Sequence, residues 1–133
     1  MNARFFVLMN HTLTPDQQAD ALGTLGVSGF VDPPPSVSRI WAAIPADADS
    51  IGGMLSPVKS WLDETARPGD TVLIQGDFGA VYHMVCYAFS KDLIPVYATT
   101  ARAAVETVMD DGSVEITRVF RHRRFRRYEQ IQI

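Results

Sequence analysis

Three short polar segments of this sequence each follow an apolar run, and together they hold side chains suited to binding an anion. The segments are Asn10-His11-Thr12, Gln75-Gly76-Asp77-Phe78-Gly79 and Thr99-Thr100-Ala101-Arg102. Amide, hydroxyl and guanidinium groups donate hydrogen bonds to phosphate oxygens, and the planar fork of arginine can hold two oxygens at once. None of the segments is sufficient alone, so the hypothesis requires all three to meet at one place.

The glycine-containing segment 75–79 stands between an apolar run and a helical pattern. A helix N-terminus carries unpaired N–H groups and a partial positive charge of about half a unit. Gly76 and Gly79 have no side chain that would keep a phosphate away from those groups. The alternative is that Asp77 caps the helix and the glycines only satisfy turn dihedral angles, and the two readings are compatible. The segment is neither a Walker motif nor a full dinucleotide fingerprint.

The other two segments supply candidate donors and a candidate acid. His11 can donate to a phosphate or act as a general acid, or it can be a structural histidine. Asn10 either orients a ribose or phosphate or forms a turn. Arg102 either contacts the ligand together with Thr99 and Thr100 or pairs with a surface carboxylate.

Histidine and cysteine are too few and too scattered for a metal site. No H-E-x-x-H or D-x-D motif is present, so we expect neither a metal nor a cofactor. The single cysteine, Cys86, lies in an apolar helical pattern, where we expect it to pack as a small hydrophobic residue. The lack of a disulfide framework, of a signal peptide and of an apolar run of about 20 residues predicts a cytoplasmic protein with no membrane partner.

Strands and helices alternate along the chain. Apolar runs typical of buried parallel strands occupy residues 3–9, 29–31, 71–74 and 93–98. Helical spacing of apolar residues occupies about 14–25, 36–43, 51–66 and 78–90. Thr14 and Gln17 predict a capping box with Pro15 at the first helical position, and Gly26 is expected to end that helix.

The C-terminal part of the chain predicts a β-hairpin. Residues 105–109 and 114–120 flank Asp110-Asp111-Gly112-Ser113, a sequence typical of a hairpin turn, although 103–109 also fits a helical turn. We therefore expect one α/β domain over residues 1–133. It is a Rossmann-like open, mostly parallel sheet flanked by helices, with a C-terminal β-hairpin and Arg-rich tail over about 103–133. In such sheets ligands bind outside the carboxyl ends of the strands, where the three polar segments are expected.

Charge is distributed unevenly. Residues 1–117 carry six basic and fourteen acidic side chains, whereas residues 118–133 carry six arginines and one glutamate. In this tail Arg123 and its neighbours alternate with aromatic rings, an arrangement that can hold nucleic acid. The alternatives are an edge strand whose charges prevent aggregation, or a dimer contact matched to the acidic body.

Six blocks of the sequence resemble small stand-alone ring nucleases associated with type III CRISPR systems, of the Csx-twenty type. In chain order they are NHTLT at 10–14, LGV at 25–27, IWAAIP at 40–45, GDTVLIQGDFGA at 69–80, LIPVYATTAR at 93–102 and DGSV…RVFRHRRFR at 111–126. QGDFGA and YATT-x-R are the most distinctive. The resemblance implies a CARF-like fold and cleavage of a cyclic oligoadenylate second messenger, with cyclic tetraadenylate as the expected ligand.

The resemblance also implies a homodimer, because a ring of four adenylates has a two-fold symmetry that an isologous dimer matches. The ribose 2′-OH would attack the neighbouring phosphorus without a metal, giving linear oligoadenylates that end in a 2′,3′-cyclic phosphate. The expected catalytic residues are His11, Thr99 and Arg102. The expected ligand-binding residues are Asn10, Gln75, Gly76, Asp77, Phe78, Gly79, Thr100 and Arg123.

Two other functions fit the same residues. The first is a sensor or sequestering protein that binds a cyclic nucleotide without cutting it. The second is an RNA-binding accessory subunit that uses the Arg-rich tail and prefers linear RNA. DNA is not an expected partner.

Overall fold

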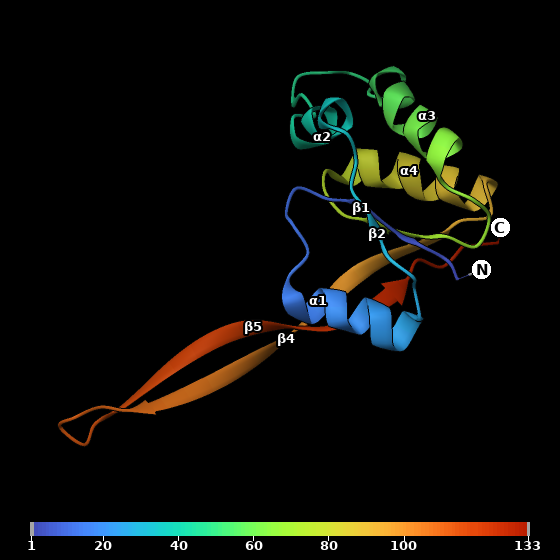
Figure 1. Cartoon of the computed structure of the whole chain (residues 1–133). Coiled ribbons are helices and arrows are strands. Elements are labelled where there is room, and N and C mark those ends of the chain that lie inside the picture. The colour runs from blue at the N-terminus through green and yellow to red at the C-terminus, as the bar shows by residue number, and fades with distance from the viewer. Residues whose placement is uncertain (1, 133) are drawn as a thin grey trace.

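The computed structural model describes residues 2–132, which fold around one five-stranded sheet with the strand order β2-β1-β3-β4-β5 (Figure 1). The strands are β1 (Phe5–Leu8), β2 (Phe30–Val31), β3 (Thr71–Ile74), β4 (Ile94–Val108) and β5 (Val114–Arg127). Strands β2, β1, β3 and β4 run parallel, and β5 runs antiparallel to β4. The predicted Rossmann-like α/β sheet with a C-terminal hairpin is confirmed.

Helices cover both faces of this sheet (Figure 1). One face carries α1 (Pro15–Asp20), which continues into a π-helical turn at Ala21–Leu25. The other face carries α2 (Pro35–Ala42), α3 (Ser56–Thr65) and α4 (Phe78–Ser90), and the 3-10 turn η2 (Gly53–Leu55) leads into α3. All four predicted helices are present, and α4 has the predicted bounds.

The strands divide the core in two, because successive side chains point to opposite faces. Phe6 and Leu8 pack with the core on the side of α2, α3 and α4. Phe5 and Val7 pack with the core on the α1 side. All four residues are buried, which explains why this strand reads as a continuous apolar run instead of an alternating one.

The predicted helix start after β1 is confirmed. The Thr14 hydroxyl accepts from the Gln17 backbone N–H at 3.2 Å, and the Gln17 side chain accepts from the Thr14 N–H at 3.0 Å. Gly26 ends the helical region in a left-handed conformation with φ 67°. Because this cap fixes where α1 begins, the residues between Leu8 and Thr14 remain as a loop at the sheet edge.

The connections that follow β1 and β3 leave the sheet toward opposite faces. These neighbouring strands are paired from Phe5 with Thr71 to Leu8 with Ile74. The helix that follows β1 lies on one face, whereas the helix that follows β3 lies on the opposite face (Figure 1). In an open α/β sheet this point of divergence leaves a crevice outside the carboxyl ends of the two strands, where ligands bind.

The predicted loop at Thr99–Arg102 is wrong. β4 continues through these residues as one 15-residue strand and pairs with β5 from Val96 opposite Arg127 out to Val108 opposite Val114. The Arg-rich tail is therefore largely strand β5, which satisfies the backbone of residues 99–108 and also excludes the alternative helical turn at 103–109. Gly112 closes the hairpin with φ 84°, and the Met109 N–H donates to the Ser113 carbonyl at 2.8 Å.

The expectation that Cys86 packs in the core is also wrong, because its side chain is exposed on α4. The inward face of α4 consists of Ala80, Met84 and Ala88, which are spaced at i, i+4 and i+8. Cys86 follows Met84 by two residues and so points about 200° away around the helix. Within residues 2–132 no helix combines the length and the apolar character needed to cross a bilayer.

Candidate functional site

Gln75 links the ends of β1 and β3 to Ala98, the fifth residue of β4, at the carboxyl edge of the parallel strands. Its backbone N–H donates to the Leu8 carbonyl of β1 at 3.1 Å. Its side-chain oxygen accepts from the Ala98 N–H of β4 at 2.5 Å, and Gln75 itself directly follows β3. The segments after β1, after β3 and beyond Ala98 are therefore fixed relative to one another.

The first two polar segments and the beginning of the third lie at this edge, whereas the rest of the third continues along β4 to Arg102. Asn10 and His11 follow Leu8 by two and three residues and are exposed. Gly76 follows Gln75, and Thr99 follows Ala98. These residues consequently lie along the carboxyl edge of the sheet, where an open α/β sheet binds its ligands.

Two aromatic side chains donate hydrogen bonds to backbone carbonyls at the end of β3. The Trp41 indole N–H donates to the Gln75 carbonyl at 2.8 Å, and the Tyr128 hydroxyl donates to the Ile74 carbonyl at 2.7 Å. Burial raises the pKa of Tyr128 above its usual value. These contacts satisfy backbone carbonyls that the sheet leaves unpaired, and no local sequence pattern indicates either contact.

Gly76 has a packing role that the sequence did not reveal. A β-carbon at this position would lie 2.8 Å from the Trp41 indole nitrogen, and the backbone φ is 156°. The close approach that requires glycine here is to a buried tryptophan of α2. At Gly79 a β-carbon would meet Asp77 and Ile51 at 3.4 Å, which is ordinary contact.

Asp77 caps α4, as one reading of the sequence held. Its carboxylate accepts from the Ala80 N–H at 3.0 Å, and its carbonyl accepts from the Val81 N–H at 2.8 Å. The negative charge of Asp77 already lies against the positive end of the helix. The carboxylate therefore offsets part of the positive charge that the helix end could offer to an anion.

Phe78, the first residue of α4, presents its ring almost entirely to solvent, with 94% of the residue exposed. Tyr82, one turn further along α4, is also exposed. Exposed aromatic rings beside a polar crevice are suited to stacking on nucleobases. The ring of Phe78 is thus open to contact from solvent.

Two arginines of β5 flank the edge in addition to those named by the sequence. Thr99 donates its hydroxyl to the Arg124 carbonyl at 3.0 Å. Arg126 lies over the Tyr97 ring, with its guanidinium carbon 5.4 Å from the ring centroid, and donates to the Tyr97 hydroxyl at 3.0 Å. Sequence reasoning missed Arg126 because only the hairpin register aligns it with Tyr97.

Arg102 and Arg123 lie outside this crevice in the single chain. Arg102 follows Thr99 by three residues, or about 10 Å of extended strand, and its guanidinium carbon lies 5.8 Å from the centroid of the Phe120 ring. Arg123 is the extra residue of a β-bulge opposite Thr99 and Thr100. It borders a small depression of about 330 Å³ beside α1.

His122 fixes the base of the hairpin to α1, a role that its place in the Arg-rich tail did not indicate. Its Nε2 lies 2.7 Å from a carboxylate oxygen of Asp20, and its side chain is only 6% exposed. Its Nδ1 is buried without a partner among the described residues. A hydrogen bond from Thr24, followed by the contact with His122, holds the pKa of Asp20 below its usual value.

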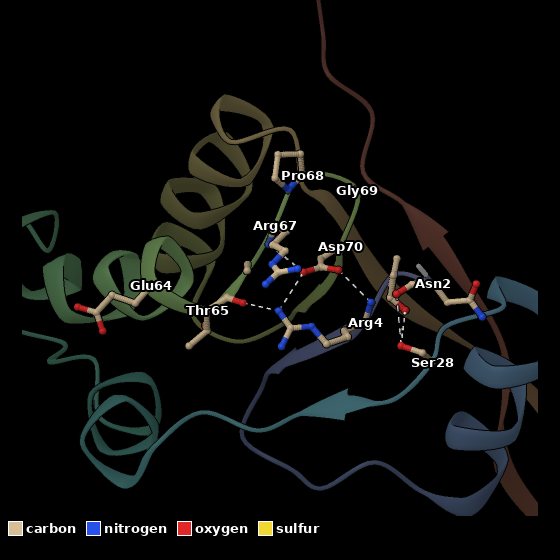
Figure 2. Close-up of a pocket in the computed structure, with 11 residues that line it drawn as sticks. Asn2, Arg4, Ser28, Glu64, Thr65, Arg67, Pro68, Gly69 and Asp70 are labelled. Atoms are coloured by element: carbon tan, nitrogen blue, oxygen red, sulfur yellow. Dashed lines mark hydrogen bonds and ion pairs between the residues drawn. The ribbon is translucent and has the colours of Figure 1, made fainter.

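A wide depression of about 1120 Å³ lies at the opposite, amino edge of the sheet (Figure 2). Two of its charged side chains, Arg4 and Asp70, form an ion pair. Asp70 accepts from the Arg4 N–H at 2.9 Å and from the Arg67 N–H at 2.8 Å, and the Arg4 guanidinium also bonds the Thr65 carbonyl. These contacts hold the amino ends of β1 and β3 together, so the depression has a structural explanation.

No group of three or more histidine, cysteine, aspartate or glutamate side chains in residues 2–132 is arranged to hold a metal ion. The segments at the carboxyl edge offer hydrogen-bond donors and the imidazole of His11.

Comparison with known proteins places the chain in a family. The family described as "Uncharacterized protein MJ1673 family" matches residues 3–126, which include all three polar segments. A relative, "Uncharacterized protein MJ1673" from Methanocaldococcus jannaschii, is 46% identical over 125 residues, covering 94% of this chain and 96% of the relative. No solved structure matches the chain. The chain therefore belongs to the MJ1673 family.

Proposed function

We propose that this protein is a metal-independent ring nuclease that cleaves a cyclic oligoadenylate, with cyclic tetraadenylate as the substrate. The observation that carries the proposal is the convergence at Gln75. Its hydrogen bonds to Leu8 and Ala98 hold residues of three polar segments at the carboxyl edge, where the connections after β1 and β3 leave toward opposite faces of the sheet. This is the position at which open α/β sheets bind nucleotides.

The resemblance to type III CRISPR ring nucleases supports the same assignment. Its two most distinctive blocks, QGDFGA and YATT-x-R, contain Gln75 and Thr99. Two of the blocks that carry the resemblance thus contribute residues to the carboxyl edge of the sheet. An exposed Phe78 at this edge suits an adenine base, because every base offers a face on which a ring can stack.

The proposed reaction uses the substrate's own nucleophile. The ribose 2′-oxygen forms a bond to the adjacent phosphorus while the bond from phosphorus to the 5′-oxygen breaks. The 2′-hydroxyl proton passes to solvent, and His11 protonates the leaving 5′-oxygen. One strand end then carries a 2′,3′-cyclic phosphate and the other a free 5′-hydroxyl. Holding the 2′-oxygen in line with the leaving group is worth several kcal/mol.

Positioning and charge stabilisation are assigned to the remaining groups. Thr99 has its hydroxyl proton engaged with the Arg124 carbonyl, so the exposed Thr100 is the better donor to a phosphate oxygen. The N–H groups of Phe78 and Gly79 and the guanidinium groups of Arg102 and Arg126 would stabilise charge on the phosphorane. The assembly is proposed to be a homodimer that presents this edge twice to a two-fold symmetric ring.

The test is product analysis. Purified protein is incubated with cyclic tetraadenylate or cyclic hexaadenylate, with and without EDTA, and the products are separated by chromatography. Linear adenylates ending in a 2′,3′-cyclic phosphate, formed equally in EDTA, are expected from the tetraadenylate. Dependence on a divalent metal, or a ring left intact at saturating enzyme, would contradict the proposal.

A cyclic-nucleotide sensor is the second candidate. It is favoured by the roles already taken at the edge, because Asp77 caps α4 and Gln75 bridges strands. His11 then remains as the single acid–base group supplied by the three segments. In the same experiment a sensor would bind the ring and leave it uncut, whereas an RNA-binding accessory subunit would prefer linear RNA.

A further inference from the structure

The outer part of the β4–β5 ribbon leaves the body of the protein (Figure 1). We call residues 101–121 the arm. The inner part of the ribbon is held by Phe125 in the α1-side core and by His122 against Asp20. Within the arm only Ala103 and Val119 are even half-buried. A two-stranded ribbon is at best marginally stable alone in water, so an arm of this length needs a surface to pack on.

One face of the arm carries an apolar stripe. Residues directly opposite in an antiparallel pair share a face. Every second pair of the ribbon therefore lies on this face. These pairs are Val108 with Val114, Glu106 with Ile116, Ala104 with Arg118 and Arg102 with Phe120. The four large apolar side chains among them are between 54% and 74% exposed. Exposed apolar stripes of this kind mark interaction surfaces.

The stripe continues the protein's own core. Stepping inward along the same face, the next pairs after Arg102 and Phe120 are Thr100 opposite His122 and then Ala98 opposite Phe125. Phe125 is buried against Phe5, with ring centroids 5.0 Å apart. The face of the ribbon that is buried in the core at Phe125 is thus exposed to solvent where it continues along the arm.

The charge on the stripe face and on the body identifies a matching partner. The stripe face carries two arginines, Arg102 and Arg118, and one carboxylate, Glu106, whereas residues 1–93 contain five basic and ten acidic side chains. This face is therefore complementary in charge to the body of another copy of this chain. Charge complementarity of this kind selects partners and fixes their orientation.

The length of the arm fits a partner of the same size. The strand from Thr100 to Val108 spans about 30 Å at 3.4 Å per residue. A compact chain of this length has a radius of gyration of about 14 Å. The arm is thus long enough to lie across a body as large as its own.

We propose that the arm of each chain packs across the body of a second copy in an isologous, two-fold dimer. The stripe formed by Val108, Val114, Ile116 and Phe120 is buried against the partner. On the same face, Arg118 meets the partner's acidic surface and Arg102 reaches its carboxyl edge. The His122–Asp20 contact holds the arm at a fixed angle to its own body, which limits the conformational freedom lost on association. The dimer forms without any ligand and does not depend on the proposed function.

The test compares two neighbouring residues on opposite faces of β5. The molar mass of the wild-type protein is measured by light scattering during size exclusion, without ligand, over a range of concentrations. A dimer is expected. Ile116→Asp should raise its dissociation constant at least tenfold, whereas Thr117→Asp adds the same charge at an exposed position on the opposite face and should leave the dimer intact. Salt at 1 M should weaken the wild-type dimer, because charge pairing is screened.

Circular dichroism and thermal unfolding establish that both variants are folded. Val108→Asp, with Thr107→Asp as its control, replaces the first pair if Ile116→Asp does not fold. A monomeric wild type, or equal dissociation constants for the variant and its control, overturns the inference. If the protein is a monomer that still cleaves the ring, the arm-mediated dimer is wrong and the nuclease activity stands. If the protein is an arm-dependent dimer that leaves the ring intact, the dimer stands and the nuclease activity is wrong.

Discussion

The indole N–H of Trp41 donates a 2.8 Å hydrogen bond to the backbone carbonyl of Gln75, and the same ring lies where a β-carbon on Gly76 would be. A buried side chain of α2 therefore shapes the loop that carries the candidate site. The glycine was predicted to let a phosphate approach the backbone. The geometry instead shows a tryptophan occupying the space beside it.

Gly76→Val is consequently expected to destabilise the fold. The added side chain meets Trp41 at a distance that real contacts do not show, and overpacking of this kind costs about 1–3 kcal/mol. Gly79→Ala is the control, because its β-carbon makes only ordinary contacts and alanine favours a helix. Urea denaturation of both variants measures the effect. Equal stability of Gly76→Val and the wild type would show that Trp41 moves aside easily.

Asp77→Ala should lower the free energy of unfolding by about 1 kcal/mol, the usual cost of losing a helix N-cap. Asp77→Ser keeps a cap and should retain wild-type stability. Since the carboxylate is not assigned to the chemistry, Asp77→Ser is also expected to cleave cyclic tetraadenylate at a rate within threefold of the wild type. A tenfold loss of ring affinity in this stable variant would instead assign Asp77 to a ribose hydroxyl.

His11→Ala is expected to lower kcat for cyclic tetraadenylate at least tenfold with little change in KM, because a general acid acts on the leaving oxygen and not on ground-state binding. The matched control is His83→Ala, which removes an imidazole from α4 where it faces Gly52. Single-turnover kinetics separate the chemical step from product release. An unchanged rate for His11→Ala would remove this residue from the mechanism.

Arg102→Ala should weaken ring binding or turnover at least tenfold. The cation lies on the arm, about 10 Å along the strand from Thr99, so we expect it to act on the partner's crevice. Arg67→Ala removes an exposed cation at the opposite edge of the sheet and should change neither quantity. Mixing the Arg102→Ala chain with the His11→Ala chain should restore activity, because mixed dimers contain one complete site. No restoration would place Arg102 in its own subunit's site.

Asp20→Asn should destabilise the protein at neutral pH but not in acid. The hydrogen bond from Thr24 and the contact with His122 lower the pKa of Asp20 in the folded state. Its stabilising contribution is therefore complete above the unfolded pKa, near 4, and is lost as the pH falls through the lower folded pKa. Thermal unfolding of the variant and wild type from pH 7 to pH 3 should converge at low pH. Asp32→Asn, at an exposed position, is the control.

Much of the fold was fixed by local patterns in the sequence. The continuous apolar runs at β1 and β3 required strands buried on both faces, and the capping box at Thr14 required a helix to begin there. These features can be predicted because the apolar pattern of a strand, a helix cap and the Asp-Gly turn at 110–113 each depend on residues close together in the sequence. The alternation of strands and helices alone predicted that Asn10, Gly76 and Thr99 lie at the carboxyl edge of the sheet.

Other features depended on contacts between residues far apart in the chain. Residues 99–102 read as a loop, yet they form a strand because β5 supplies pairing partners 18 to 25 positions away. The register of that pairing, with a bulge at Arg123, decides which arginines flank the crevice and which extend along the arm. Trp41 beside Gly76 and His122 beside Asp20 likewise meet only after α2 and β5 have packed on the sheet. Local propensity does not encode such pairs, so only the tertiary structure determined them.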